Sequence, residues 1–314
     1  MFLLMLSMGM LAHAQNWPVR PVVMVVPFPP GGGTDAFARP LSAVLSKQLG
    51  RQVVIDNRGG AGGTLGATIA AHAAKDGYTI FMGAVHHAIA PSVYKKLDYN
   101  LEKDFSPVSV VAIVPQVIVV SPKRVTQTDL KSFIEYAKKN PGKLNYDSAG
   151  VGTSHHLAGE LFKSQAGVDI AHVPYKGAGP ALQDLIGAQM DVMFDGLGSS
   201  AQHIKAGTIK PLAVAATVRS PALPDVPTAA EAGLANYEVS TWYALWAVTG
   251  TPKDIVDRLV SETNKALAAT EVKTVWASQG ASVGPANPRE MAAFVSAEIA
   301  KWARVAKSGN IQVD

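Results

Sequence analysis

A proline- and glycine-rich turn near the N-terminus is the first part of the sequence that could bind a ligand. It reads Pro-Phe-Pro-Pro-Gly-Gly-Gly-Thr-Asp over residues 27–35 and directly follows the apolar run at residues 22–26. A strand, such a turn and then a helix start direct free backbone N–H groups at one place, and the N-terminal end of a helix favours negative charge. The sequence therefore predicts an anion site in its first folded unit.

The same turn could also be structural punctuation without a ligand. It lacks the Gly-Lys-Ser/Thr sequence of an NTPase phosphate loop. A direct contact between the carboxylate of Asp35 and an anion would be repulsive. We therefore expect Asp35 to cap the helix, orient the loop or hold a bridging water.

A second turn of this kind lies at residues 147–153, after a predicted strand at residues 144–146. The hydroxyls of Ser148, Thr153 and Ser154, together with the first amides of the next helix, could bind a second carboxylate oxygen. The alternative is a simple Ser/Thr helix cap, and one turn can serve both purposes.

Two pairs of neighbouring histidines are the next candidates. His86 and His87 follow the third predicted strand, where a neutral imidazole can donate to a carboxylate or stack on an aromatic ring; alternatively, one of them packs inside the fold. His155 and His156 begin the helix after the second turn. We predict no metal site, because adjacent helical residues diverge by about 100° and the sequence lacks His-Glu-x-x-His.

Four further residues have two readings each. Lys176 could bring positive charge to a ligand-binding cleft or form a surface ion pair. Asp195 follows a predicted strand and could accept a hydrogen bond from a ligand or cap a turn. Trp242 and Tyr243 could flank such a cleft or pack at a hinge between two lobes, and we favour packing.

The elements that would position these residues alternate between strand and helix. Apolar runs at residues 22–26, 53–55 and 78–82 predict strands, and the segments between them predict helices. This βαβαβ order implies a parallel sheet with right-handed crossovers. The arrangement of strand, glycine turn and helix recurs in the second half of the chain. The predicted fold class is therefore α/β, and ligands bind such sheets at the carboxyl ends of the strands.

Two long extended segments, at residues 108–120 and 238–248, predict two crossings between lobes. The expected division is lobe 1 at residues 15–108 plus 245–314, and lobe 2 at residues 109–244. Two sheets that face each other would place both glycine turns at one cleft.

The N-terminus predicts export. Residues 2–11 form a short apolar core, and Ala-His-Ala at residues 12–14 fits signal-peptidase cleavage. We predict a signal peptide at residues 1–14, cleaved near Ala14, and a periplasmic protein. No lysine or arginine precedes Arg20, so the usual basic start is missing, and the alternative is a frayed apolar tail.

Composition excludes several functions. The 314 residues include no cysteine, which rules out disulfides, thiolate nucleophiles and cysteine-based metal sites. A net charge of +4 without a long basic run gives no indication of nucleic-acid binding. With 48% apolar and 17% charged residues, the chain can form large cores.

A series of motifs runs down the chain in one order. They are Trp17-Pro18-x-Arg20-Pro21, Val26-Pro27-Phe28-x-x-Gly31-Gly32-x-Thr34-Asp35, Asp56-Asn57-Arg58-x-Gly60-Ala61-Gly62-Gly63, Asp76-Gly77-Tyr78-Thr79, Asn145-Tyr146-x-Ser148-Ala149-Gly150-x-Gly152-Thr153, His172-Val173-Pro174-Tyr175-Lys176-Gly177 and Leu223-Pro224-Asp225-Val226-Pro227-Thr228. Together these motifs resemble the Bug-type, or TctC-like, solute-binding proteins, the periplasmic components of tripartite tricarboxylate transporters. The resemblance covers essentially the whole mature chain.

The resemblance implies a type II periplasmic-binding-protein fold, with two α/β lobes, a two-strand hinge and a cleft that closes on a small carboxylate. It also implies a ligand held by the first turn, the segment at residues 84–87 and the turn at residues 148–154. With the candidates above, the predicted ligand-binding residues are Phe28, Gly31, Gly32, Thr34, Asp35, His86, His87, Ser148, Ala149, Gly150, Thr153, Ser154, Lys176 and Asp195.

The predicted function is therefore a solute-binding protein that delivers an organic carboxylate to membrane subunits of the TctA/TctB kind. It requires no catalysis and no cofactor, and we expect a monomer. The histidine pair and the nearby aromatic residues favour an aromatic carboxylate slightly over a citrate-like acid. A ligand sensor for a receptor kinase would use the same fold. A secreted serine hydrolase is disfavoured, because there is no Gly-x-Ser-x-Gly elbow and the neighbours Ser154 and His155 cannot form the needed geometry.

Overall fold

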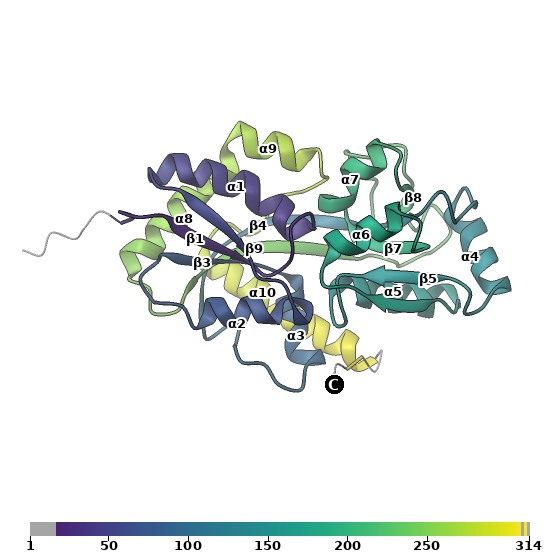
Figure 1. Ribbon diagram of the computed structural model, residues 1–314, viewed down its shortest axis with the longest axis horizontal. Coiled ribbons are helices and arrows are strands. Elements are labelled where there is room, and N and C mark those ends of the chain that lie inside the picture. The colour runs from purple at the N-terminus through teal and green to yellow at the C-terminus, as the bar shows by residue number, and fades with distance from the viewer. Residues whose placement is uncertain (1–16, 309–310, 313–314) are drawn as a thin grey trace, which may run out of the picture.

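The protein consists of two α/β lobes that lie side by side and share two long strands (Figure 1). The computed structural model describes residues 17–308 and 311–312. The predicted signal peptide at residues 1–14 lies outside the described residues. The predicted α/β class with two lobes is confirmed.

The elements follow one another in the alternating order that the sequence predicts. In chain order they are β1 (Val22–Val26), α1 (Gly33–Leu49), β2 (Val53–Asn57), η1 (Ala61–Gly63), α2 (Thr64–Ala71), β3 (Thr79–Ala84), α3 (Val85–Val93), β4 (Phe105–Val120), α4 (Leu130–Lys139), β5 (Asn145–Ser148), α5 (Ser154–Ala166), β6 (Ala171–Pro174), α6 (Ala178–Ile186), β7 (Val192–Gly196), α7 (Leu197–Lys205), β8 (Lys210–Val214), β9 (Ser240–Val248), α8 (Lys253–Ala268), α9 (Thr270–Ala277) and α10 (Pro288–Ser308).

The first lobe is built on the predicted βαβαβ unit. Strand β1 pairs in parallel with β2 on one side and with β3 on the other. Its apolar residues are almost all buried, as expected for a strand that is covered on both faces. Helix α1 buries Phe37, Leu41 and Leu45, and it ends at Gly50, whose positive φ of 68° gives a left-handed C-cap.

The two predicted extended segments are strands β4 and β9, which pair antiparallel along the boundary between the lobes. From Phe105 to Pro115, strand β4 pairs with β9, which also pairs with β3 of the first lobe. From Gln116 to Val120, β4 pairs instead with β7 and β8 of the second lobe. One continuous strand therefore belongs to both sheets, and the predicted lobe boundaries at 108/109 and 244/245 fall inside β4 and β9.

The second lobe repeats the parallel arrangement, with β5 between β6 and β7. Helix α5 begins where the sequence predicts, because the side chain of Thr153 accepts a hydrogen bond from the backbone N–H of His156. Helix α4 is capped by Asp129, whose carboxylate accepts from the N–H of Ser132 at 2.8 Å.

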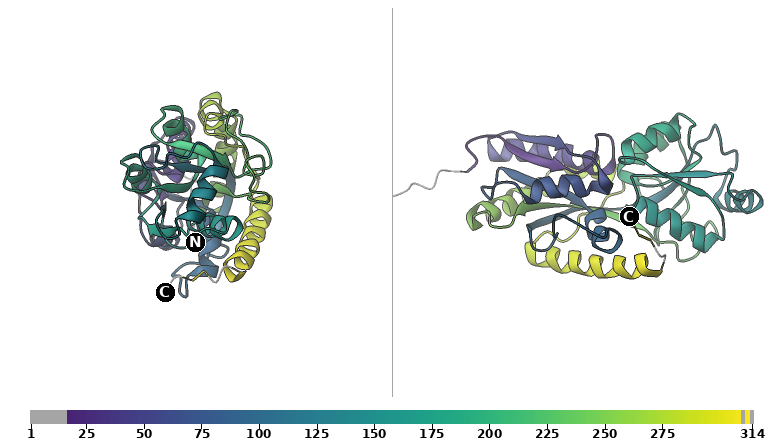
Figure 2. Two further views of the ribbon diagram at one scale, coloured as in Figure 1. Left: turned by 90° about the vertical axis from the view of Figure 1, so that its right-hand side faces the viewer. Right: turned by 60° about the horizontal axis from the view of Figure 1, so that its bottom comes forward.

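The C-terminal helices return to the first lobe. Helices α8 and α9 contact α1, and α10 lies along α3 and β4 (Figure 2). Strand β9 anchors this packing, since Trp242 and Trp246 are almost fully buried and the indole N–H of Trp242 donates to Glu298 of α10 at 2.9 Å. No helix among the described residues combines the length and apolar character needed to cross a bilayer.

Candidate ligand site between the lobes

A small cavity lies where the two lobes meet. Its lining comes from both lobes and includes both glycine turns predicted from the sequence. The lining residues are Phe28, Gly32, Gly33, Thr34, His86, Ala149, His155, Ala178 and Tyr243. The cavity has room for about one water molecule. A larger ligand can therefore enter only when the lobes separate.

Residues from the first turns of four helices line this cavity. Helix α1 contributes Gly33 and Thr34, helix α3 contributes His86, helix α5 contributes His155 and helix α6 contributes Ala178. The first backbone N–H groups of a helix have no partner within the helix, and the N-terminus carries a partial positive charge. The convergence of the four N-termini from both lobes gives the cavity a local electrostatic field that favours negative charge.

Glycine allows the lobes to approach closely here. The N-terminus of α6 lies against the first turn, so that a Cβ added at Gly179 would lie 2.4 Å from the carbonyl oxygen of Pro30. The hydroxyl of Tyr94 in the first lobe donates to the carbonyl of Val151 in the second, at 3.2 Å. The site is thus assembled by contact between the lobes.

Asp35 organises the first turn. Its carboxylate accepts from the backbone N–H of Gly31 at 3.1 Å and from the amide of Asn57 at 3.2 Å, and it forms a two-point ion pair with Arg39 at 2.8 Å. Of the roles considered for it, the structure supports orientation of the loop. Helix capping does not occur, since Gly32 occupies the N-cap position without a side-chain bond.

We expect Asp35→Ala to lower the free energy of unfolding by about 2–3 kcal/mol, because it leaves the Gly31 N–H and the Arg39 guanidinium without their charged partner. Urea denaturation measures this change. Asp257→Ala is the matched control, since Asp257 pairs with Lys253 on the exposed face of α8. The control should change stability by less than about 1 kcal/mol. Equal effects of the two substitutions would contradict an organising role for Asp35.

His86 connects the lobes. Its Nδ1 accepts a hydrogen bond from the backbone N–H of Ser154 at 3.0 Å, so the first turn of α3 is joined to the first turn of α5. Burial, and then the neighbouring His155 and His87, hold the pKa of His86 well below its usual range. The ring is therefore neutral, and because Nδ1 accepts, its hydrogen is on Nε2. The donor nitrogen of His86, a residue that lines the cavity, is therefore Nε2.

His155 and Asp195 form a second polar group at the cavity. The Nε2 of His155 lies 3.1 Å from Oδ1 of Asp195. The hydroxyls of Ser199 and Ser200 donate to the other oxygen of Asp195, at 2.6 and 2.5 Å. All of these side chains are buried. Asp195, predicted as a ligand contact, therefore lies behind His155 rather than on the cavity.

Comparison with known proteins assigns the chain and its fold to a family. The sequence model described as "Tripartite tricarboxylate transporter family receptor", TctC, matches residues 37–311. The chain belongs to the TctC family. This confirms the resemblance drawn from the sequence motifs, and it makes the chain a member of a family of periplasmic solute-binding receptors rather than of enzymes.

Solved structures of similar proteins agree with the TctC assignment. The periplasmic binding protein BugD is 39% identical with a TM-score of 0.91, over 94% of this chain and 99% of that one. Rpa4515 of R. palustris, solved with adipate, is 40% identical with a TM-score of 0.90, over 94% and 99%. MatC from Rhodopseudomonas palustris, solved with malate, is 38% identical with a TM-score of 0.87, over 92% and 99%.

The predicted site residues of this TctC-family chain fall into two groups. Phe28, Gly32, Thr34, His86 and Ala149 line the cavity. The others do not line it: Gly31, Asp35, Gly150, Thr153, Ser154, Ser148, His87, Lys176 and Asp195.

Within the second group, the hydroxyls mainly serve their own turn. Ser148 accepts from the N–H of Gly150 at 3.1 Å, and Thr153 donates to the carbonyl of Gly150 at 2.7 Å. The alternative of a helix cap thus describes Thr153. Ser154 contributes through its backbone N–H, while its hydroxyl accepts from Gln116 at 3.2 Å.

His87 and Lys176 lie away from the cavity. The Nδ1 of His87 lies 3.0 Å from the backbone N–H of Ala84, its Nε2 lies 3.3 Å from the carbonyl oxygen of Gly63, and its ring packs on Phe81. The alternative that one member of the first histidine pair points into packing therefore describes His87. Lys176 is exposed on the surface of the second lobe.

Four lining residues are absent from the list of predicted ligand-binding residues: Tyr243, His155, Gly33 and Ala178. Packing was favoured for both Trp242 and Tyr243, and this is right for Trp242 but incomplete for Tyr243. Tyr243 stacks on Phe37 with ring centroids 4.8 Å apart and also lines the cavity. Alternation along strand β9 was the available signal, because neighbouring residues of a strand point to opposite faces.

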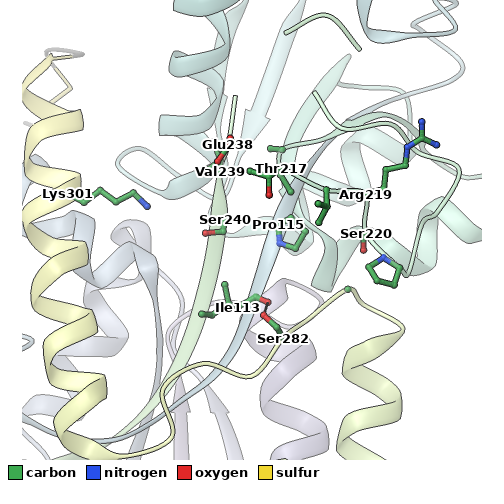
Figure 3. A pocket seen from close by; sticks show the side chains of 15 residues that line it. Ile113, Pro115, Thr217, Arg219, Ser220, Glu238, Val239, Ser240, Ser282 and Lys301 are labelled. Atoms are coloured by element: carbon green, nitrogen blue, oxygen red, sulfur yellow. Dashed lines mark hydrogen bonds between the residues drawn. The ribbon is translucent and has the colours of Figure 1, made fainter. Parts of the chain in front are cut away.

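A larger hollow, about 420 Å³, lies behind the two shared strands (Figure 3). Figure 3 shows Lys301 reaching from α10 toward the start of β9. Two of the charged residues there are already paired, Arg219 with Glu231 and Lys301 with Glu298. Neither glycine turn reaches this hollow, so the smaller cavity between the lobes is the candidate site. Among the described residues, no group of three or more His, Asp or Glu side chains is placed to hold a metal.

Proposed function

We propose that this chain is an exported receptor that captures a small organic carboxylate between its lobes and delivers it to membrane subunits of the TctA/TctB kind. The observation that supports this proposal is the convergence of four helix N-termini on one cavity between the lobes. Related structures were solved with the dicarboxylates adipate and malate. Export would follow from the signal peptide predicted at residues 1–14, and the receptor would act as a monomer without catalysis.

Among carboxylates, we propose a preference for an aromatic acid over a citrate-like acid. Four rings line the cavity, those of Phe28, His86, His155 and Tyr243. The rings of Phe28 and His86 meet edge to face with centroids 5.0 Å apart. The ring of an aromatic ligand can add another contact of this kind.

The serine–histidine contact in the second lobe does not suggest hydrolysis. The hydroxyl of Ser148 lies 2.7 Å from Nε2 of His172. However, Ser148 is fully buried, and its oxygen also accepts from the N–H of Gly150 in the same turn. A nucleophile needs access to its substrate, so this contact serves the turn.

Calorimetric titration of the mature protein tests the proposal. The ligands are benzoate, phenylacetate, adipate, malate and citrate, with the matching primary amides as neutral controls. We expect at least one carboxylate to bind and the amides to bind at least about 100-fold more weakly, because the helix N-termini favour a negative charge. Binding of none of these acids, or equal binding of acid and amide, would overturn the proposed function. Tighter binding of citrate than of every aromatic acid would overturn the aromatic preference alone.

Delivery is tested separately. Cells that express the two membrane subunits should take up labelled ligand only when this chain is also present. Uptake that is independent of the chain would contradict delivery while leaving ligand capture intact.

A further inference from the structure

A hydrogen bond between an imidazole ring and a backbone N–H joins the two lobes. Nδ1 of His86, on α3 of the first lobe, accepts from the N–H of Ser154, on α5 of the second lobe, and the two nitrogen atoms lie 3.0 Å apart. Both residues are buried. Ser154 is the first residue of α5, so its N–H has no partner within the helix. The contact therefore exists only while the two helix starts lie against each other.

This contact needs a neutral imidazole. A backbone N–H can only donate, so Nδ1 of His86 must present a lone pair. A protonated ring carries hydrogens on both nitrogens, and it would place two N–H donors 3.0 Å apart. Protonation of His86 and contact between α3 and α5 therefore exclude each other.

The groups around His86 in the closed form do not stabilise a positive charge on it. The ring of His155 on α5 has its centroid 5.4 Å away, His87 adds a second imidazole on α3, and Tyr243 of β9 lines the same cavity. The carboxylate of Asp195 on β7 contacts His155 rather than His86. The N-termini of α1, α5 and α6 add partial positive charge. Burial, and then the two histidines, hold the pKa of His86 well below its usual range in this form.

Other hydrogen bonds between the lobes do not respond to mild acid. The hydroxyl of Tyr94 donates to the carbonyl of Val151 at 3.2 Å, and the ammonium of Lys205 donates to the carbonyl of Ser278 at 3.0 Å. Tyrosine and lysine ordinarily titrate at about pH 10, whereas histidine titrates between about pH 5 and 8. The contact at the start of α5 is thus the pH-sensitive one of these three.

We propose that His86 is a positioning residue that makes capture of the carboxylate depend on pH. At neutral pH its Nδ1 holds the first turn of α5 against α3 in the closed form. In mild acid, protonation of the ring in the open form prevents this closure, and the ligand is released. This inference rests on the proposed function and adds its regulation. It requires no contact between His86 and the ligand.

The direction and size of the effect follow from proton linkage. In the open form the ring faces water and titrates at or below its ordinary pKa of 6.5, because the N-terminus of α3 disfavours a positive charge. In the closed form the ring stays neutral. Closure is therefore fully available above the pKa of the open form and is lost as pH falls through it. The affinity should be at least about fourfold lower at pH 5.5 than at pH 7.5.

Calorimetric titration of the mature protein at pH 7.5 and pH 5.5 tests the proposal. The probe is the acid that binds most tightly at pH 7.5 among benzoate, phenylacetate, adipate, malate and citrate. The matched variant is His86→Asn, because the amide oxygen of asparagine can accept the same hydrogen bond and does not titrate. We define the acid loss as the ratio of the dissociation constants at pH 5.5 and pH 7.5. It should be at least about fourfold larger in the wild-type protein than in His86→Asn, and this comparison cancels protonation of the probe itself.

The outcomes separate this inference from the proposed function. A smaller difference in acid loss between the wild-type protein and His86→Asn would overturn the inference and leave ligand capture standing. Tighter binding of the wild-type protein in acid would also overturn it, because an imidazolium would then be binding the carboxylate. Binding of none of the five acids at pH 7.5 would overturn the proposed function and the inference with it.

Two changes at Ser154 test the same contact from the second lobe. Ser154→Pro removes the N–H that His86 accepts and puts a methylene group in its place, while Ser154→Ala keeps the N–H. Proline is favoured at the first position of a helix, and Thr153 before it has the extended backbone that a residue before proline prefers, with φ −82° and ψ 164°.

At pH 7.5, Ser154→Pro should bind the probe at least about tenfold more weakly than Ser154→Ala. The acid loss should remain in Ser154→Ala and be absent from Ser154→Pro. A smaller difference in affinity between these two variants, or an acid loss that survives in Ser154→Pro, would overturn the role of the contact between His86 and Ser154.

Discussion

Gly179→Ala should weaken ligand binding by at least about 100-fold without destabilising the fold. A Cβ at this position would lie 2.4 Å from the carbonyl oxygen of Pro30, a backbone atom of the opposite lobe. The lobes can relieve this clash only by staying apart. Within α6 itself, alanine is the better helix former, by up to about 1 kcal/mol. The unfolding temperature without ligand should therefore be unchanged or higher, while the ligand-induced rise is lost.

A control on the same helix isolates the effect of closure. Gln183 is exposed on α6, and Gln183→Ala adds the same helix former without touching the first lobe. Calorimetry should give it the wild-type affinity. Small-angle scattering with ligand should show a compact shape for the control and a more extended one for Gly179→Ala. Wild-type affinity in Gly179→Ala would mean that closure on the ligand does not bring α6 against the first turn.

The sequence was sufficient for the order of elements, because that order depends on local patterns. The apolar run at β1, the glycine turn and the Thr153 cap each act over a few residues, and each was found in place. The two long strands could also be recognised as crossings. The sequence does not reveal that two sheets share these strands, because the sharing depends on pairing partners that lie far apart in the chain.

The site was predictable as a place but only partly as a set of side chains. Both glycine turns reach the cavity, since the carboxyl ends of strands meet at one edge of a sheet. Whether a given histidine faces that cavity depends on the rotation of its helix. His86 faces it while His87 points into the core, and His155 faces it while His156 stacks on His172. A one-residue difference reverses the role, and the sequence contains no signal that fixes it.

The same buried histidines predict a steep loss of stability in mild acid. Burial lowers the pKa of His87 from 6.5 to about 4, and it holds the pKa of His86 well below its usual range. At pH values between the ordinary pKa of histidine and the lowered pKa of each buried one, the unfolded chain binds protons that the folded chain does not. Stability therefore falls as pH falls. The contribution is complete above pH 6.5 and is lost from there down to about pH 4 for His87, at about 1.4 kcal/mol per pH unit for each histidine.

His87→Gln should remove most of the His87 share of this acid sensitivity, which amounts to about 3 kcal/mol between pH 6.5 and pH 4. His87 is the third residue of α3, and its Nδ1 lies 3.0 Å from the N–H of Ala84 at the N-cap. Glutamine at this position can accept the same hydrogen bond and does not titrate. Urea denaturation at pH 7.5 and pH 4.5 measures the difference.

The exposed change His72→Gln should leave the acid sensitivity as it is. Acid sensitivity that His87→Gln leaves intact would mean that His87 is not the titrating group, and the loss would then arise from other buried groups, such as His86 at the contact between the lobes.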